Sequence, residues 1–375
     1  MTRVVPLHLF VTKSTELLEI IDCLRIHYHV KVNYESARIT KSTLVKDRRE
    51  HQCYQFTKIP AYIALVKHQN PEIHIHLVTT TAQEDNNQNA FQRLFICPHE
   101  SRQSFRHMRK FLAVDGTFLK ARFVQTLLFA VGIDGNGESL LLAWGVVESE
   151  NTESWTWFLE NLKSVIPETV GMTLISDRDK GLLTADRAVY GNGINQLICC
   201  FHLKGNFCKR YGSQLSNSFW QAANSKIRQD CARYMEDLRL QNPTAADYLI
   251  KIDPSLWVTA YYPAPHYGHR ASNIVESMNS VFREDRELSI LDLLNEVWHY
   301  TMDQRYRWYN CACQLEYNHH QLHTDYCLAQ LQESNQWAAQ NRVRMATEIE
   351  GEVQQANGRI FLVNLGHRIC SCGHF

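Results

Sequence analysis

The stretch FLAVDGTFLK, residues 111–120, opens with four apolar residues and then places Asp115 directly after them. The apolar runs FVQTLLFAVGID (123–134) and ESLLLAWGVVES (138–149) follow, and they share the turn sequence DGNGE (134–138). Short apolar runs bounded by turn residues are typical of strands. The segment therefore predicts three successive strands, the first of which ends at Asp115.

The pattern then alternates between helix and strand. The sequence NTESWTWFLENLKSVIP (151–167) has an apolar helical face, with Thr152 as the expected N-cap. A fourth strand is expected at 172–177, a helix at 180–190 and a fifth strand at 195–202. This order predicts an α/β fold, a mixed sheet flanked by helices.

Helical patterns dominate on both sides of this region. Before it, helices are expected at 14–28 and 60–71, and the polar run 81–89 is expected to be a linker. After it, the chain is mainly helical, with further helices expected at 272–285 and 289–309, and it ends in strand and turn patterns. We therefore expect three parts: a helical and mixed N-terminal region (1–105), a catalytic domain (106–310) and a C-terminal segment (311–375).

Composition narrows the class of protein. The 375 residues are 45% hydrophobic, enough for a sizeable core, and no apolar run reaches the length of a membrane span. No secretory signal is recognisable, so the 12 cysteines are expected to be reduced thiols in cytosol or nucleus. The net charge of zero disfavours a chain that is mainly a nucleic-acid-binding cation, although a local basic face remains compatible with it.

Acids recur where strands end. Asp115 and Asp177 both follow apolar strand runs, and strand ends of an α/β sheet are where ligands collect. Two adjacent carboxylates repel unless a cation lies between them, and oxygen ligands suit Mg²⁺ or Mn²⁺. Glu276, in an expected helix flanked by apolar residues, is the third candidate. Each acid taken alone also fits a simpler interpretation: a turn or cap residue for the aspartates, and a solvated or Arg283-paired position for Glu276.

Four neighbours of these acids have expected supporting roles. Gly116 permits a tight turn and close backbone approach, and Thr117 is placed to orient Asp115 by a hydrogen bond. Arg178 and Lys180 are candidates for contacts with a phosphate.

The motifs DGTF (115–118), SDRDKGL (176–182) and NIVESMNS (273–280), in this order, resemble the transposase domain of Mutator-like elements, the MULE family. The resemblance extends over roughly residues 50–310. It implies a ribonuclease-H-like fold with a DDE triad, whose acids fall on Asp115, Asp177 and Glu276. It also implies a helical insertion, here about 203–270, before the helix that carries the Glu.

Two cysteine motifs belong to further resemblances. The family's Cys-x-x-His motif falls on Cys199 and His202, with a structural or substrate-orienting role; a buried Cys and a helix-capping His is the simpler alternative. The C-terminal sequence RICSCGHF is similar to the start of a SWIM zinc finger, in which Cys370 and Cys372 are the first ligand pair. Since no second pair follows, two unpaired thiols are expected rather than a Zn²⁺ site.

The resemblance implies an enzyme: a DDE transposase, a metal-dependent DNA phosphoryl transferase that cleaves and joins transposon ends, with Mg²⁺ or Mn²⁺ as cofactor. Its partners would be DNA and a second copy of the chain in a homodimer or larger assembly, its compartment the nucleus, and no membrane is involved. The alternative is a domesticated MULE-derived regulator that binds DNA without cutting it, or an inactive relic. The presence of all three acids favours the enzyme.

Overall fold

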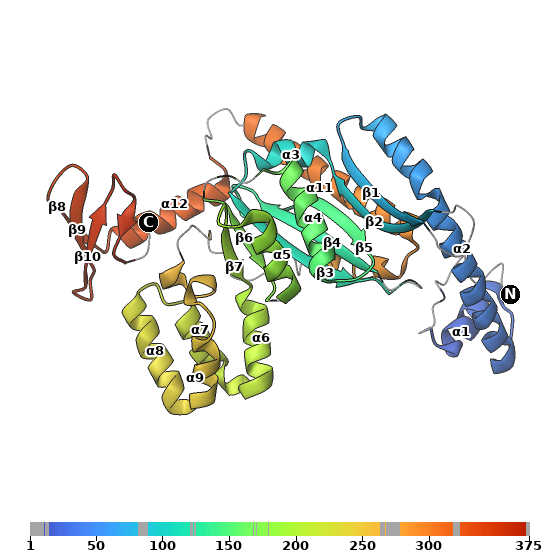
Figure 1. Cartoon of the computed structure of the whole chain (residues 1–375), viewed down its shortest axis with the longest axis horizontal. Coiled ribbons are helices and arrows are strands. Elements are labelled where there is room, and N and C mark those ends of the chain that lie inside the picture. The colour runs from blue at the N-terminus through green and yellow to red at the C-terminus, as the bar shows by residue number, and fades with distance from the viewer. Residues whose placement is uncertain are drawn as a thin grey trace. The chain divides into compact units, whose positions relative to one another are not determined.

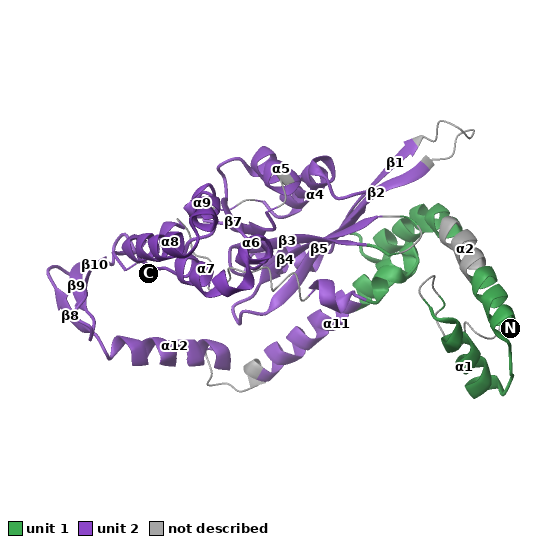
Figure 2. Ribbon diagram, turned by 90° about the horizontal axis from the view of Figure 1, so that it is seen from below, with its two compact units in different colours: residues 1–71, 119–124, 284–299 green, residues 72–118, 125–283, 300–375 purple. Residues whose placement is uncertain are grey.

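The structure is a computed structural model that describes residues 11, 15–81, 89–120, 123, 125–167, 169, 171–178, 180–262, 267, 278–317 and 323–372. The chain forms two compact units, coloured separately in Figure 2. Unit 1 consists of residues 1–71, 119–124 and 284–299, and unit 2 of residues 72–118, 125–283 and 300–375.

A mixed sheet forms the centre of unit 2 (Figure 1). In the described part of the chain it has seven strands in the order β1-β2-β5-β4-β3-β6-β7. The strands are β1 (His74–Thr81), β2 (Asn89–Cys97), β3 (Phe111–Phe118), β4 (Thr126–Ile133), β5 (Ser139–Val147), β6 (Thr173–Ser176) and β7 (Asn195–Ile198). The three strands expected from residue 111 onward are thus β3, β4 and β5, each antiparallel to the next.

The hairpin β1–β2 lies in the region for which helical and mixed structure was predicted. Its strands pair antiparallel from His74↔Cys97 to Thr81↔Asn89, and β2 adds the pair to the sheet through β5. Of the polar run that was expected to be a linker, Thr81 and Asn89 belong to the two paired strands, and residues 82–88 lie outside the described residues.

The strand β3 continues beyond the acid that was expected to end it. Its antiparallel pairing with β4 runs without interruption from Leu112↔Gly132 to Phe118↔Thr126. Asp115 therefore lies inside the strand, and the expected tight turn at Gly116 is wrong. The close approach expected at Gly116 is present, because a Cβ there would lie 3.0 Å from Leu128 Cδ2.

The two faces of β3 differ. On one face, Leu112 and Val114 belong to a buried cluster with Trp155 and Phe158 of α4 (Thr152–Val165). Successive residues of a strand point to opposite faces, so Asp115 points away from this cluster. In Figure 1, α4 and α5 (Lys180–Tyr190) lie in front of the sheet, and the part of α11 (Ile290–Tyr317) that belongs to unit 2 lies behind it.

Local hydrogen bonds fix the start of α4. The side chain of Asn151 accepts a hydrogen bond from the backbone N–H of Ser154, so Asn151 is the N-cap and not the expected Thr152. The short helix α3 (His99–Phe105) follows β2 and packs against β5.

A helical insertion follows β7 and has its own core. Its helices are α6 (Cys200–Tyr211), α7 (Ser216–Ala223), α8 (Arg228–Gln241) and α9 (Pro243–Ile250). Phe207, Phe219 and Trp257 are buried at its centre, where Phe219 stacks on Trp257 with ring centroids 5.5 Å apart. Because β7 ends at Ile198 and α6 begins two residues later, the strand expected over 195–202 is shorter than predicted.

Unit 1 is helical. It contains α1 (Leu17–Tyr28), α2 (Tyr34–Gln69) and the first residues of α11 (Ile290–Tyr317). Pro60, which was expected to begin a helix, lies inside α2, so the helix expected at 60–71 is the end of a much longer one. The side chain of Gln55, in α2, accepts a hydrogen bond from the N–H of Leu291.

The C-terminal part of unit 2 begins with residues 300–317 of α11. Gln304 accepts a hydrogen bond from the N–H of Leu141 and donates one to the carbonyl of Ser139, which joins α11 to β5. The remaining elements are α12 (Asp325–Ala338) and a four-stranded sheet of β8 (Arg342–Met345), β9 (Glu350–Gln354), β10 (Ile360–Asn364) and β11 (Ile369–Cys370).

A mixed sheet flanked by helices confirms the predicted α/β class. None of the helices in the described residues is both long enough and apolar enough to cross a membrane.

Candidate active site

The structure brings Asp115 and Asp177 to the same face of the sheet. Strands β3 and β6 are parallel neighbours with the register Leu112↔Leu174 and Ala113↔Ile175. If the register is extended by two residues beyond Ala113↔Ile175, Asp115 lies opposite Asp177. Both side chains then point to the same face, because each lies two residues beyond a paired residue.

A helical turn at 278–281 is anchored directly over Asp115. The cross-strand partner of Asp115 on β4 is Phe129, and the ring of Phe282 stacks on Phe129 with centroids 5.5 Å apart. Met278 and Phe282 are both almost fully buried, which fixes the turn on the sheet. Asn279, beside Met278, donates a hydrogen bond from its side-chain amide to Asp115 Oδ2 at 2.9 Å.

The environment of Asp115 disfavours its charged form. Burial raises the pKa of this carboxyl to about 6, although the N–H of Gly116, 2.9 Å from Oδ1, and the nearby His202 act in the opposite direction. The carboxylates of Asp177 and Glu150 raise the pKa further. Asp115 is thus surrounded by other acids and balanced by one nearby cation.

That cation is the imidazole of His202, at the start of α6. Its Nδ1 lies 3.8 Å from Asp177 Oδ1. A hydrogen bond with Cys199 raises the pKa of His202 to about 9, and the carboxylates of Asp177 and Asp115 add to this effect against partial burial. Cys199 is also the N-cap of α6, since its sulfur accepts a hydrogen bond from the His202 N–H. The Cys-x-x-His motif therefore places a positive charge beside the acid pair.

The other predicted residues divide into described and undescribed positions. Arg178 lies next to the acid pair, and its N–H donates to Asp177 Oδ1 at 2.5 Å. Thr117 is buried and lies on the same face of β3 as Asp115. Its orienting hydrogen bond stays a prediction. Lys180 begins α5, but its side chain lies outside the described residues, as does the whole of Glu276.

The structure adds two residues that sequence reasoning missed, Asn279 and Glu150. Asn279 follows Glu276 by three residues, a spacing that puts both on one helical face, and this signal was available in the sequence. Glu150 lies in the connection between β5 and α4. A Cβ on Gly116 would stand 3.3 Å from its carboxyl carbon. Nothing in the pattern around Glu150 distinguished it from an ordinary loop acid.

The donor chemistry at this face fits a hard divalent cation. Two level carboxylates offer oxygen ligands, and the buried Asp115 carboxyl lies near the acids Asp177 and Glu150, a concentration of negative charge that a bound cation relieves. Among the described residues, no group of three or more His, Cys, Asp or Glu side chains is arranged to hold a metal. A complete set of ligands therefore needs a further donor beyond those residues, and Glu276 is the predicted one.

The second predicted metal position lies far along the chain, in the small C-terminal sheet. The sulfur atoms of Cys370 and Cys372 are 2.8 Å apart. Within the described residues no third ligand joins them. The prediction of a zinc-finger start at this position stays untested.

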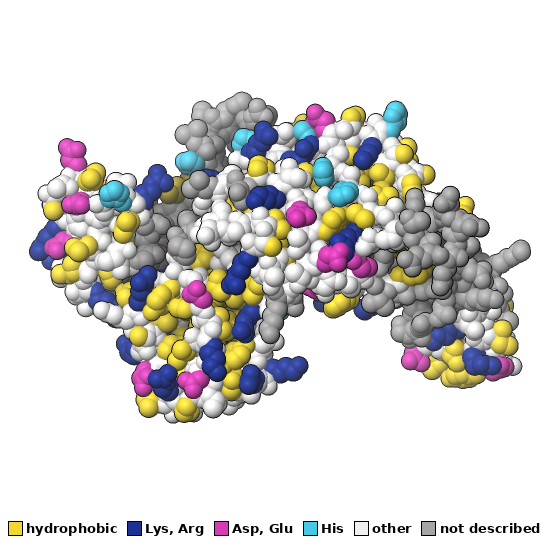
Figure 3. Space-filling view, in the orientation of Figure 1, with side chains coloured by type: hydrophobic (Ala, Val, Ile, Leu, Met, Phe, Trp, Pro, Cys, Tyr) yellow, Lys and Arg dark blue, Asp and Glu magenta, His cyan; other side chains and the backbone are white. Residues whose placement is uncertain are grey.

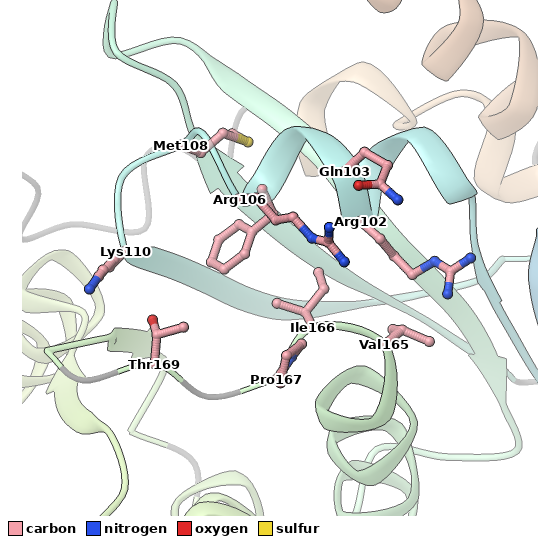
Figure 4. Close-up of a pocket in the computed structure, with 10 residues that line it drawn as sticks. Arg102, Gln103, Arg106, Met108, Lys110, Val165, Ile166, Pro167 and Thr169 are labelled. Atoms are coloured by element: carbon pink, nitrogen blue, oxygen red, sulfur yellow. The ribbon is translucent and has the colours of Figure 1, made fainter.

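A cavity of about 170 Å³ lies at the opposite end of β3 and β6 (Figure 4). Arg102, Arg106 and Lys110 line it, together with apolar side chains that include Phe105 and Ile166. Lys110 precedes Asp115 by five residues, which corresponds to about 16 Å along an extended strand. This cavity is therefore separate from the acid pair.

Comparison with known protein families agrees with the motifs. Residues 111–206 match the family described as "MULE transposase domain". No curated protein matches the chain. The matched segment runs from β3 into α6 and includes Asp115, Asp177, Cys199 and His202. The resemblance to the MULE family stated from the sequence is therefore confirmed for this part of the chain.

Proposed function

We propose that this chain is a DDE-type transposase that cleaves DNA strands at transposon ends and transfers them to target DNA. The observation that carries the proposal is the level placement of Asp115 and Asp177 on one face of adjacent parallel strands, inside a MULE transposase domain. The strand order β5-β4-β3-β6-β7 supports the ribonuclease-H-like fold that the resemblance implies. The substrate is DNA, and the chain acts in the nucleus.

Asp115, Asp177 and Glu276 are the proposed ligands of Mg²⁺ or Mn²⁺. When bound, such ions supply Lewis-acid stabilisation of the attacking and leaving oxygens in phosphoryl transfer. The role of the protein is to hold the carboxylates in place. Gly116 and Asn279 fix the two oxygens of Asp115, one each, so the carboxylate is oriented before substrate arrives.

His202 has a proposed electrostatic role. Its imidazole lies 3.8 Å from Asp177, and its raised pKa keeps it protonated at neutral pH. The positive charge offsets the mutual repulsion of Asp115 and Asp177, which keeps the acids together in the free protein. Because a transposon has two ends, two copies of the chain are the expected working unit.

The test is a strand-cleavage assay on supercoiled plasmid DNA with Mg²⁺ or Mn²⁺. Wild-type protein should nick the plasmid only with the metal present, and Asp115→Asn and Asp177→Asn should abolish nicking. Glu160→Gln, which changes an exposed acid of α4, is the matched control and should leave nicking unchanged. Undiminished nicking by either aspartate variant refutes the assignment. Metal-independent DNA binding without any nicking would favour the regulator instead.

A further inference from the structure

Two arginines lie close to the ring of Tyr248, and one of them, Arg178, directly follows Asp177 in the chain. The Nη1 of Arg178 donates a hydrogen bond to Tyr248 Oη at 2.8 Å. The Arg178 guanidinium lies 5.5 Å from the centroid of the Tyr248 ring, and the Arg210 guanidinium lies 5.7 Å from the same centroid. We call Arg178, Tyr248 and Arg210 the arginine clamp.

The clamp is built on the core of the helical insertion. Tyr248 belongs to α9, and its ring lies 5.6 Å from that of Tyr211 and 6.4 Å from that of Phe207, both on α6. Phe207 is fully buried and packs on Phe219 of α7. Arg210 also lies over Tyr211, at 5.4 Å. Both guanidinium groups therefore lie against a packed aromatic cluster.

The clamp carries positive charge, and none of the ion pairs between described residues includes Arg178 or Arg210. Two other arginines of the insertion do form ion pairs: Arg233 pairs with Asp230 and Arg239 with Asp247, each at 3.6 Å. The segment 200–211 adds two lysines and contains no acid. Figure 3 shows dark blue Lys and Arg side chains among the yellow ones over the insertion.

The two positive guanidinium groups lie 5.5 and 5.7 Å from the centroid of one ring, so an anion beside them stabilises the arrangement. Guanidinium groups bind phosphate oxygens in a bidentate manner, and aromatic stacking orients them for it. The proximity of the clamp to Asp177 restricts which phosphate is meant. A strand that placed its reacting phosphate at Asp115 and Asp177 would bring a neighbouring phosphate to Arg178.

We propose that the arginine clamp binds a backbone phosphate of the DNA strand next to the reacting phosphate, and so positions the strand on the acid pair. This inference rests on the proposed function, since it takes the acid pair as the reaction centre. A contact of this kind carries no base specificity, because phosphates are the same at every position.

The test measures binding of the full chain to a fluorescent DNA duplex in EDTA, by anisotropy, from 50 to 300 mM salt. The clamp variant is Arg178→Gln with Arg210→Gln. Arg233→Gln with Arg239→Gln removes the same charge from α8 and is the matched control. We expect the clamp variant to weaken binding about tenfold or more and to reduce the slope of log affinity against log salt by about 0.9 for each lost phosphate contact. The control should change both quantities much less.

A second variant guards against misfolding. Tyr248→Phe keeps the ring and removes only the hydroxyl that orients Arg178, so it should weaken binding by a smaller factor with an unchanged salt slope. Equal effects of the clamp and control variants would overturn the proposal. Absence of salt-dependent DNA binding by the wild type, or tighter binding of heparin than of DNA, would also overturn it.

The outcome is separable from the proposed function because binding is measured without metal. If Asp115-dependent nicking is found while the clamp variant binds DNA like the wild type, the clamp fails and the function stands. If the clamp variant loses DNA binding while the wild type nicks no DNA, the clamp stands and the function fails.

Discussion

The two faces of β3 carry different chemistry, although the residues that form them alternate along the same strand. On one face, Leu112 and Val114 are fully buried against Trp155 and Phe158. On the other, Asp115 meets Asp177, His202 and the amide of Asn279. The apolar face packs against α4 and contributes to the core of the unit. The difference shows that one strand can carry core residues on one face and candidate catalytic residues on the other, because successive side chains point to opposite faces.

The sharpest test of this difference is to change Asp115 and to measure both the stability of the protein and its nicking activity. We expect Asp115→Asn to reduce metal-dependent nicking by about 10⁴-fold, in the range of lost essential catalytic groups. The free energy of unfolding should not fall, because a neutral amide avoids the cost that raises the pKa of the carboxyl. Both expectations are checked by measuring urea unfolding and nicking rates on one preparation of the variant. A loss of stability that accounts for the lost activity would contradict a functional role.

The opposite change belongs on the apolar face. Phe158→Ala removes a fully buried ring that packs edge-on against Phe95 and Trp155. We expect a loss of about 3–5 kcal/mol in the free energy of unfolding, from lost burial and the cavity left behind. Nicking per folded molecule should stay within a few fold of wild type. A selective loss of nicking at full stability would show that the two faces are not separate.

A buried acid on the side of the sheet that α4 and α5 cover allows the cost of burying a charge there to be measured. Asp186 of α5 is 2% exposed, and burial raises its pKa from 3.8 to about 7. Between these values the unfolded chain releases the proton while the folded chain keeps it, so stability falls as pH rises from 4 to 7.

Asp186→Asn removes this penalty. The variant should be more stable than wild type at pH 8, by up to about 4 kcal/mol, and little changed at pH 4. Urea unfolding at both pH values measures it. A destabilised variant at pH 8 would mean that the charged carboxylate has a favourable partner in the folded protein.

The smallest expected effect concerns Asn279, which contacts the candidate catalytic residue Asp115 and lies between residues of the packed core. Its amide orients Asp115, while its neighbours Met278 and Phe282 are part of the packing. Asn279→Ala should reduce nicking by about 10–100-fold, as is typical when a residue that supports a metal ligand is lost. The adjacent, exposed Ser280→Ala is the control. Raised metal concentration should partly restore the Asn279→Ala rate, a recovery that a purely structural defect would not show.

The sequence was sufficient for the parts of the fold with strong local periodicity. The strands β3 to β5 and the helices α4 and α5 follow from apolar runs and from the order of elements. The hairpin β1–β2 was missed because its first strand, HIHLVTTT, is polar and rich in histidine, and it gains its order from pairing with the rest of the sheet.

The supporting residues of the site depend on long-range packing. Asn279 reaches Asp115 because Phe282 stacks on Phe129, a contact between residues 153 positions apart in the chain. Glu150 approaches Gly116 because β5 ends at Val147, which pairs with Thr126 of β4, and Thr126 in turn pairs with Phe118 of β3. No local pattern encodes either contact. The acids were identifiable because Asp115 and Asp177 directly follow apolar runs, whereas their contacts with distant residues depend on how the chain packs.

The most direct test of the central claim is anomalous diffraction from crystals soaked in Mn²⁺. The account predicts a manganese peak within bonding distance of carboxylate oxygens of both Asp115 and Asp177, with Glu276 as a further ligand. A structure with Mn²⁺ bound elsewhere, and with the carboxylates of Asp115 and Asp177 too far apart to share an ion, would contradict it.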